Sequence, residues 1–273
     1  PPHGMYDIPV NDPAWKLYEG EAWINDPAIP QDVKNYAAMV SMVDHNVGQV
    51  LSLLRELKLE NDTIVFFTGD NGGQDRFRSP KHPRGFFGPN VNPKNGAEFR
   101  GGKGNLFEGG LRIPYLVRWP GKIKPRQVND LIFYQPDVLP TLAELTGAKA
   151  PDGIDGISFL PTLLSQAQTK KHEMLYWEFR GQTAVRQGLW KAIQTKPDRP
   201  WELYDLSQDI SESTNVVAKH LERLAKMKAF AKASHEPVRA GKYLDPKRTR
   251  HERDRKAKWG TAKPQPRARR PRK

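Results

Sequence analysis

A strand-like run that ends in Asp-Asn-Gly-Gly constrains this chain more than any other feature. Residues 63–68, Thr-Ile-Val-Phe-Phe-Thr, are all β-branched or aromatic, which predicts a buried strand. Asp70 and Asn71 follow at its carboxyl end, before two glycines that predict a turn. Ligands of open α/β sheets bind at the carboxyl ends of strands, and these two side chains offer the hard oxygen ligands that Ca²⁺ or Mg²⁺ prefers. Taken alone, Asp-Asn-Gly is better explained as an ordinary Asx turn.

The patterns around this strand predict an α/β fold. Apolar residues at three- and four-residue spacing predict an amphipathic helix over about residues 32–58, with Asp32 as its N-cap. Asp44 falls on the apolar side of this helix, so we expect it to be buried with a polar partner. A further helix is predicted over residues 134–146 and ends at Gly147. Helix, short link and strand in this order are typical of an α/β layer.

The last third of the chain predicts a different architecture. Short β-rich runs separated by turn residues predict a small antiparallel sheet, which a helix over about 214–232 closes. The predicted strands are residues 174–179, 183–186, 190–193 and 202–206. We therefore expect three parts: an α/β part over residues 1–168, a small sheet-and-helix subdomain over 169–235, and a basic tail over 236–273.

The net charge of +13 is concentrated near the C-terminus. Residues 242–273 hold fourteen lysines and arginines and three acidic residues, so they carry eleven of the thirteen net charges. The stretch 263–273 is rich in proline and arginine and predicts disorder. A solvated tail is the preferred interpretation, and contact with a polyanion is the alternative. No nucleic-acid motif accompanies the charge, so no specific nucleic-acid partner is expected.

Cysteine is absent, which excludes a disulfide framework, a thiolate metal site and a cysteine nucleophile on these residues. No apolar run is long enough to span a bilayer. The first residues, Pro-Pro-His-Gly, are neither an initiator methionine nor a signal peptide, so we expect the chain to be a fragment.

Three short elements together suit an anion site. They are His3, the Asp70–Asn71 pair, and Lys103 within Gly-Gly-Lys-Gly. Glycines around a lysine let the backbone pass close to a bound anion and let the ammonium reach it. A lysine, a histidine and a divalent cation would together bind a tetrahedral oxyanion, either sulfate or phosphate.

In order along the chain, these elements and their flanks resemble the C-terminal portion of the type I sulfatases, within the alkaline-phosphatase-like superfamily. The resemblance covers roughly residues 1–230 and leaves the basic tail outside. The stretches that carry it are P-P-H-G, Y-A-A-M-V-S-M-V-D-H-N-V-G-Q-V-L, D-T-I-V-F-F-T-G-D-N-G-G, R-G-G-K-G-N-L-F-E-G-G-L-R-I-P-Y-L-V-R-W-P-G, D-V-L-P-T-L-A-E-L-T-G, A-V-R-Q-G-L-W-K-A-I and E-L-Y-D-L-S-Q-D.

The resemblance implies a fold and individual roles. Residues 1–168 would be the C-terminal part of an α/β catalytic domain with a sheet flanked by helices. Asp70 and Asn71 would be calcium ligands, Lys103 would contact the sulfate ester, and His3 would touch the sulfate or assist the leaving group. His3 and Lys103 are thus the expected catalytic and substrate-binding residues. Ca²⁺ is expected in preference to Mg²⁺.

Two parts of the family pattern are absent from this chain. It has no C/S-x-P-S-R motif, from which the family makes its formylglycine nucleophile, and no Asp-Asp pair for the first calcium ligands. We expect both on a missing N-terminal part, so the chain alone should be inactive. Glu108 and Arg112 match family positions, and we interpret them as residues that shape the loop.

The implied function is calcium-dependent hydrolysis of a sulfate ester, either an aryl sulfate or a sulfated glycan, in the periplasm or outside the cell. Two alternatives stay open. One is a phosphoester or phosphonate hydrolase of the same superfamily, and the other is a catalytically inactive, polyanion-binding fragment.

Overall fold

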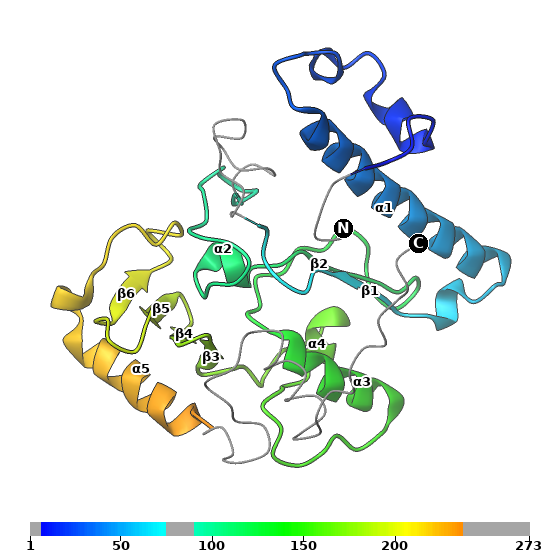
Figure 1. Cartoon of the computed structure of the whole chain (residues 1–273). Coiled ribbons are helices and arrows are strands. Elements are labelled where there is room, and N and C mark those ends of the chain that lie inside the picture. Colours follow the sequence, from blue (N-terminus) through cyan, green and yellow to red (C-terminus); the bar gives the residue numbers. More distant parts are fainter. Residues whose placement is uncertain (1–6, 75–89, 237–273) are drawn as a thin grey trace, which may run out of the picture. The chain divides into compact units, whose positions relative to one another are not determined.

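The computed structural model describes residues 7–74 and 90–236, and by its contacts the chain divides into two units, Pro1–Ala231 and Lys232–Lys273. His3 and the basic stretch 242–273 lie outside the described residues. The described part combines helices with two antiparallel sheets (Figure 1), consistent with the predicted α/β class. In chain order its elements are η1 (Pro13–Tyr18), η2 (Ala22–Ile24), α1 (Gln31–Glu56), η3 (Glu60–Asp62), β1 (Val65–Thr68), α2 (Glu108–Leu111), β2 (Tyr115–Arg118), η4 (Gln135–Asp137), α3 (Val138–Thr146), α4 (Leu160–Leu163), β3 (Leu175–Phe179), β4 (Gln182–Gln187), β5 (Trp190–Gln194), β6 (Glu202–Asp205), η5 (Val217–Lys219) and α5 (Leu221–Ser234).

Helix α1 corresponds to the first predicted helix, but its N-cap is Pro30, two residues before the predicted Asp32. Its first half packs on η1 through a buried cluster that includes Ala14, Ala38 and Met39. In the part of the chain that the structure describes, no helix is long and apolar enough to cross a bilayer.

The prediction that Asp44 is buried is wrong. Asp44 is exposed, and Val40, one turn before it on α1, is 46% exposed. The apolar periodicity of a helix marks a face that can be buried, but a second layer must pack on that face to exclude water. Within the described residues, that layer covers only the first half of α1.

Strand β1 pairs with β2 in an antiparallel ladder in which Phe67 lies opposite Leu116. The strand is not buried as predicted, since these two side chains are 40% and 59% exposed. The opposite face is covered, because Phe66 packs edge-to-face on Tyr115 and Phe133 packs on the same ring, with centroids 6.1 and 4.7 Å apart. One face of the ladder is therefore packed within the described residues and the other is open.

The second predicted helix forms as η4 followed by α3. It ends as expected at Gly147, whose φ of +70° is the left-handed conformation that glycine adopts without strain. Asp137 closes the first turn by accepting a hydrogen bond from Tyr134 N (3.0 Å). The same buried carboxylate lies 2.8 Å from His172 Nε2, which ties α3 to the segment that leads into β3.

Strands β3 to β6 form the predicted four-stranded antiparallel sheet, in sequential order. Successive side chains alternate between its two faces. Ala184, Ile193 and Tyr204 pack with Leu106 and Phe107 of the segment before α2. The alternate residues, Val185, Ala192 and Leu203, pack with Leu224, Met227 and Ala231 of α5. The sheet therefore lies between the α2 segment and α5, as Figure 1 shows.

The closing helix is shorter than predicted. Residues 214–220 contain only the turn η5, and α5 begins at Leu221. That residues 169–235 form a separate subdomain stays a prediction.

Candidate anion and metal site

Strand β1 leads into Asp70 and Asn71, as predicted, and both residues are exposed. The preceding Gly69 N donates to Pro114 O (3.4 Å), which holds the start of the turn beside β2. A carboxylate and an amide oxygen therefore lie at the carboxyl end of the strand, where a ligand can reach them.

The loop that carries Lys103 (the Lys103 loop, residues 101–107) and the helix α2 that follows it are hydrogen-bonded directly to this turn. Lys103 N donates to Gly73 O (2.7 Å), and Gly72 N donates to Gly110 O (3.0 Å). Asn90 Nδ2 lies 3.2 Å from both Gly73 O and Gly109 O and joins the same two segments. The structure thus brings together the Asp70–Asn71 turn and the Lys103 loop, which sequence reasoning had connected only through a resemblance.

Glycine is required where these segments cross. A Cβ atom built on Gly72 would lie 2.0 Å from Gly109 O, and one built on Gly109 would lie 2.1 Å from Gly101 O. Each contact is with backbone, which cannot rotate away as a side-chain tip can. The glycine-rich sequences on both sides therefore permit a close approach of two main chains.

Replacing Gly72 with alanine is expected to lower the free energy of unfolding by about 1–3 kcal/mol, the usual cost of forcing extra atoms into a packed site. Gly48→Ala is the matched control, since Gly48 lies in α1 with nothing within 4 Å of a built Cβ. That control should stabilise the chain by about 0.5–1 kcal/mol, the helix preference of alanine over glycine. Urea denaturation of both variants measures the difference. A Gly72→Ala variant that is as stable as the wild type, or more stable, would contradict the close approach.

A buried charge cluster lies directly after the Lys103 loop. Its buried centre consists of Glu108, Lys191 and Glu212, and at its edge lie Arg186, 12% exposed, and Arg112, 41% exposed. Lys191 Nζ lies 2.9 Å from Glu108 Oε1 and 2.8 Å from Glu212 Oε1, and all three side chains are at most 1% exposed. Glu108 Oε2 accepts from Arg112 Nε (2.6 Å) and from Arg186 (3.1 Å). Glu108 N donates to Glu212 Oε2 (2.6 Å).

The two carboxylates of the cluster have different electrostatic environments. Burial alone would raise the pKa of Glu108, but the charges of Lys191, Arg186 and Arg112 hold that pKa at about 2. Burial raises the pKa of Glu212, and Lys191 opposes this shift. Glu108 is therefore a stable anion, and Lys191 is the cation on which both buried carboxylates depend.

Sequence reasoning had assigned Glu108 and Arg112 to shaping the loop but missed their partners in the small sheet. The sequence contained one signal: Lys191 lies in a strand between apolar residues, where a charged side chain must be buried with a partner. The identity of that partner, 83 residues earlier, has no local signature.

The donor chemistry of Asp70 and Asn71 fits a calcium ion, which takes carboxylate and carbonyl oxygens. The number of donors does not suffice, because Ca²⁺ takes six to eight oxygens. Within residues 7–74 and 90–236, no three or more histidine, aspartate or glutamate side chains are grouped to hold a metal. The pair can therefore supply part of a calcium site, and further ligands would have to come from elsewhere.

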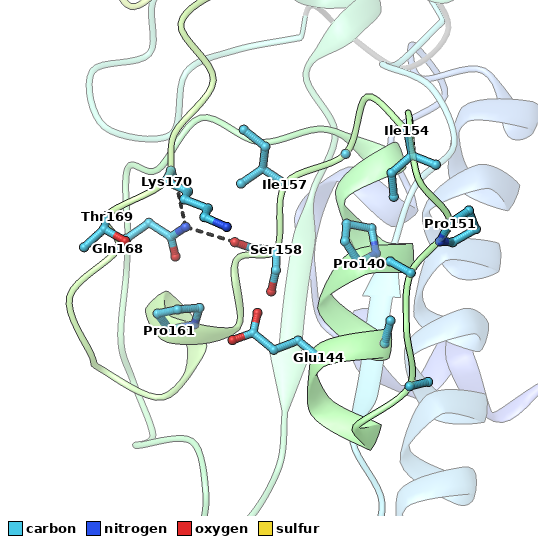
Figure 2. Close-up of a pocket in the computed structure, with 14 residues that line it drawn as sticks. Pro140, Glu144, Pro151, Ile154, Ile157, Ser158, Pro161, Gln168, Thr169 and Lys170 are labelled. Atoms are coloured by element: carbon cyan, nitrogen blue, oxygen red, sulfur yellow. Dashed lines mark hydrogen bonds between the residues drawn. The ribbon is translucent and has the colours of Figure 1, made fainter.

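A cavity of about 530 Å³ lies apart from Asp70, Asn71 and Lys103, none of which line it. Its walls come from α3 and the segment that follows, and Glu144 and Lys170 are its charged lining residues (Figure 2). Gln168 Nε2 closes one wall by donating to Ser158 O (2.9 Å) and Lys170 O (2.7 Å). It contributes nothing to the anion and metal site.

Comparison with known protein families gives two matches. The family described as sulfatase matches residues 2–148. The family described as N-sulphoglucosamine sulphohydrolase, C-terminal, matches residues 102–234. Together they cover the Asp70–Asn71 turn, the Lys103 loop and the small sheet.

Individual relatives agree with these matches. Mouse steryl-sulfatase is 39% identical over 170 residues, which are 60% of this chain and 26% of the mouse protein. N-acetylgalactosamine-6-O-sulfatase of Bacteroides thetaiotaomicron is 30% identical over 233 residues, which are 76% of this chain and 44% of that protein. The crystal structure of Ps i-CgsB in complex with k-i-k-neocarrahexaose matches 85% of this chain and 47% of its own, with a TM-score of 0.64 and 25% identity. The chain thus spans about a quarter to about half of the length of these relatives.

Proposed function

The chain belongs to the sulfatase family, and on that premise we propose that the complete protein hydrolyses a sulfate ester. The observation that carries the proposal is the hydrogen bond from Lys103 N to Gly73 O, which joins the lysine loop to the Asp70–Asn71 turn. A cationic side chain and two oxygen ligands for a cation are thereby held on adjacent loops. This is the charge arrangement that a tetrahedral oxyanion requires.

In sulfate ester hydrolysis, the bond between sulfur and the ester oxygen breaks and an alcohol leaves. Lys103 would hold the sulfate oxygens through its ammonium group and neutralise the charge that shifts onto them. His3 would contact the sulfate or donate the proton that the departing oxygen needs. Both roles are carried over from the family resemblance, and that of His3 concerns a residue outside the described part of the chain.

Asp70 and Asn71 would hold a calcium ion, whose positive charge would stabilise the sulfate oxygens. The nucleophile, a formylglycine in this family, would come from residues that this chain does not contain. The chain would thus supply the electrostatic part of the site, so residues 1–273 alone are expected to show no turnover.

The substrate is proposed to be an aryl sulfate or a sulfated glycan. The similar proteins include one named for steryl sulfate, one named for N-acetylgalactosamine 6-O-sulfate, and one crystallised with k-i-k-neocarrahexaose. These names support the class of sulfate esters and do not select one member.

The test compares hydrolysis of an aryl sulfate and an aryl phosphate by the longest natural protein that contains these residues. Faster hydrolysis of the sulfate is expected. Faster hydrolysis of the phosphate would favour a phosphoester or phosphonate hydrolase. Hydrolysis of neither ester would favour the inactive, polyanion-binding alternative.

Calcium binding by this longer protein should depend on Asp70. Asp70→Ala is expected to raise the dissociation constant for Ca²⁺ by at least about ten-fold. Removing a residue that only hydrogen-bonds to a metal ligand already weakens metal binding by about that factor. Asp62→Ala is the control, because Asp62 is an exposed acid on η3. Calorimetric titration of the chelator-treated protein measures both. An unchanged constant for Asp70→Ala would contradict the assignment.

We also propose export to the periplasm or the exterior of the cell, as the family resemblance implies.

Residues 242–273 form a solvated tail in our preferred interpretation, and chromatography on heparin tests the alternative, which is polyanion contact through these residues. Retention on heparin should fall with rising salt, because the basic residues there displace counterions. Deleting residues 242–273 should abolish the retention, whereas deleting 263–273 alone should only reduce it. Retention that survives the longer deletion would place the polyanion contact elsewhere.

A further inference from the structure

The Lys103 loop is held by the small sheet at several points along its length. Within the loop, the side-chain amide of Gln182, the first residue of β4, makes two contacts. Its Oε1 accepts from Leu106 N (3.2 Å), and its Nε2 donates to Gly104 O (3.2 Å). A single side chain thus ties down the backbone on the C-terminal flank of Lys103.

Before the loop, Arg100 makes the corresponding connection. Its NH1 donates to Tyr204 OH (2.7 Å) on β6 and to Glu212 O (3.0 Å). Its guanidinium carbon lies 4.0 Å from the centroid of the Phe107 ring. The N-terminal side of the loop is therefore attached to the same sheet by the hydrogen bond to Tyr204, while the cation–π contact with Phe107 holds Arg100 against the loop itself.

After the loop, the buried charge cluster makes the third connection. Glu108, at the start of α2, forms ion pairs with Lys191 on β5 and with Arg186 on β4. Between these polar contacts, Leu106 and Phe107 are buried in the apolar cluster of the sheet. The sheet therefore holds the loop before, within and after the glycine-flanked lysine.

The opposite side of the loop meets the Asp70–Gly73 turn through backbone hydrogen bonds, and the side chain of Asn90 also links Gly73 O to Gly109 O. Lys103 N donates to Gly73 O, and the crossing leaves no room for a Cβ at Gly72. A lysine flanked by glycines has little conformational preference of its own. Its place beside the turn must therefore be fixed by contacts from outside the loop, and the contacts named above come from the small sheet.

We propose that the β3–β6 sheet is the positioning element for Lys103, and that Gln182 is the positioning residue closest to it. The sheet contributes no group to the reacting atoms. It keeps the lysine backbone against the Asp70–Asn71 turn. The catalytic consequence rests on the proposed function, whereas the geometric part does not.

Hydrogen exchange of the 273-residue chain tests the geometric part. In Gln182→Leu, exchange of the Lys103 amide should speed up by about ten-fold or more, as expected when two net-stabilising hydrogen bonds are lost. Amides of the β5–β6 ladder should keep their rates. Lys103 N does not contact Gln182, so its response reports positioning rather than the direct loss of a bond.

Gln194→Leu is the matched control. Gln194 belongs to the same sheet, and its Nε2 also donates to two backbone carbonyls, Pro197 O (3.2 Å) and Arg199 O (2.8 Å). The same chemical change there should leave exchange at Lys103 within about two-fold. Equal acceleration in both variants would overturn the proposal, since the sheet would then act only through general stability.

Gln182→Glu separates the two contacts and serves if the leucine variant does not fold. Glutamate keeps the acceptor for Leu106 N but lacks the donor for Gly104 O, so an intermediate rate is expected. A rate at Lys103 equal to that of the wild type in both Gln182 variants would overturn the proposal.

The catalytic part is measured in the longer protein on an aryl sulfate. Gln182→Leu should lower kcat by about ten- to a hundred-fold, the scale of a small displacement of a catalytic group. Gln194→Leu should not change it. If exchange at Lys103 is faster but kcat is unchanged, Gln182 does position Lys103, and the proposed catalytic role of Lys103 is refuted. Unchanged exchange would refute the positioning role whatever the activity.

Discussion

Replacing Lys191 with methionine is expected to lower the free energy of unfolding by about 3–5 kcal/mol, the cost of removing one partner from a buried ion pair. Lys191 is fully buried between Glu108 and Glu212. Without it, Glu108 keeps two arginines, but Glu212 has no other ion-pair partner in the described part of the chain. Methionine fills a similar volume, so the loss reports charge rather than packing. Urea denaturation followed by circular dichroism measures it.

Two controls sharpen this result. Lys149→Met removes a lysine whose pair with Asp152 is 81% and 89% exposed, and should change stability by less than about 0.5 kcal/mol. The double variant Lys191→Met with Glu212→Gln removes the stranded charge and should recover part of the loss, because neighbouring residues couple. If Lys191→Met alone lowers the free energy of unfolding by less than about 1 kcal/mol, the buried ion pairs do not contribute as proposed.

Replacing Lys103 with alanine in the longer protein is expected to lower kcat on an aryl sulfate by about a hundred- to a thousand-fold, the usual effect of removing one preorganised donor to a developing negative charge. The structure permits this test without unfolding the loop. Lys103 is tied to the turn through its backbone N–H, which alanine keeps. Kinetics together with a denaturation curve separate a loss of activity from a loss of stability.

Lys94→Ala is the matched control for this variant. Lys94 lies on the same segment before α2, and its ammonium pairs with Asp130 at 65% side-chain exposure. Its loss should leave kcat unchanged. Lys103→Arg keeps the charge with a different donor geometry and should restore activity only in part. A loss below about ten-fold in Lys103→Ala would remove this residue from the catalytic assignment.

Local patterns were sufficient for elements whose packing partner is close in sequence. The four strands of the small sheet were predicted because each alternates side chains between two faces and is bounded by turn residues. Gly147 ended α3 because only a left-handed residue closes that turn easily. The end of β1 at Thr68, two residues before Asp70, followed from an abrupt change from β-branched residues to turn residues.

The failures have one physical origin. The patterns predicted burial for Asp44 and for β1, yet burial depends on a second layer that the described residues do not provide over those faces. Periodicity states which side of an element can be buried. Whether water is excluded there depends on what packs against it.

The sequence by itself determined the elements, their order and the chemical type of each site residue, because these follow from backbone preference and side-chain chemistry within a short window. Only the tertiary structure decided that Lys191 of β5 and Glu212 meet Glu108, and that Gln182 holds the backbone beside Lys103. These partners lie 78 to 104 residues apart in the chain. A buried lysine needs a polar partner, but no local rule selects which one, because for Lys191 the choice is made when the sheet packs on the loop.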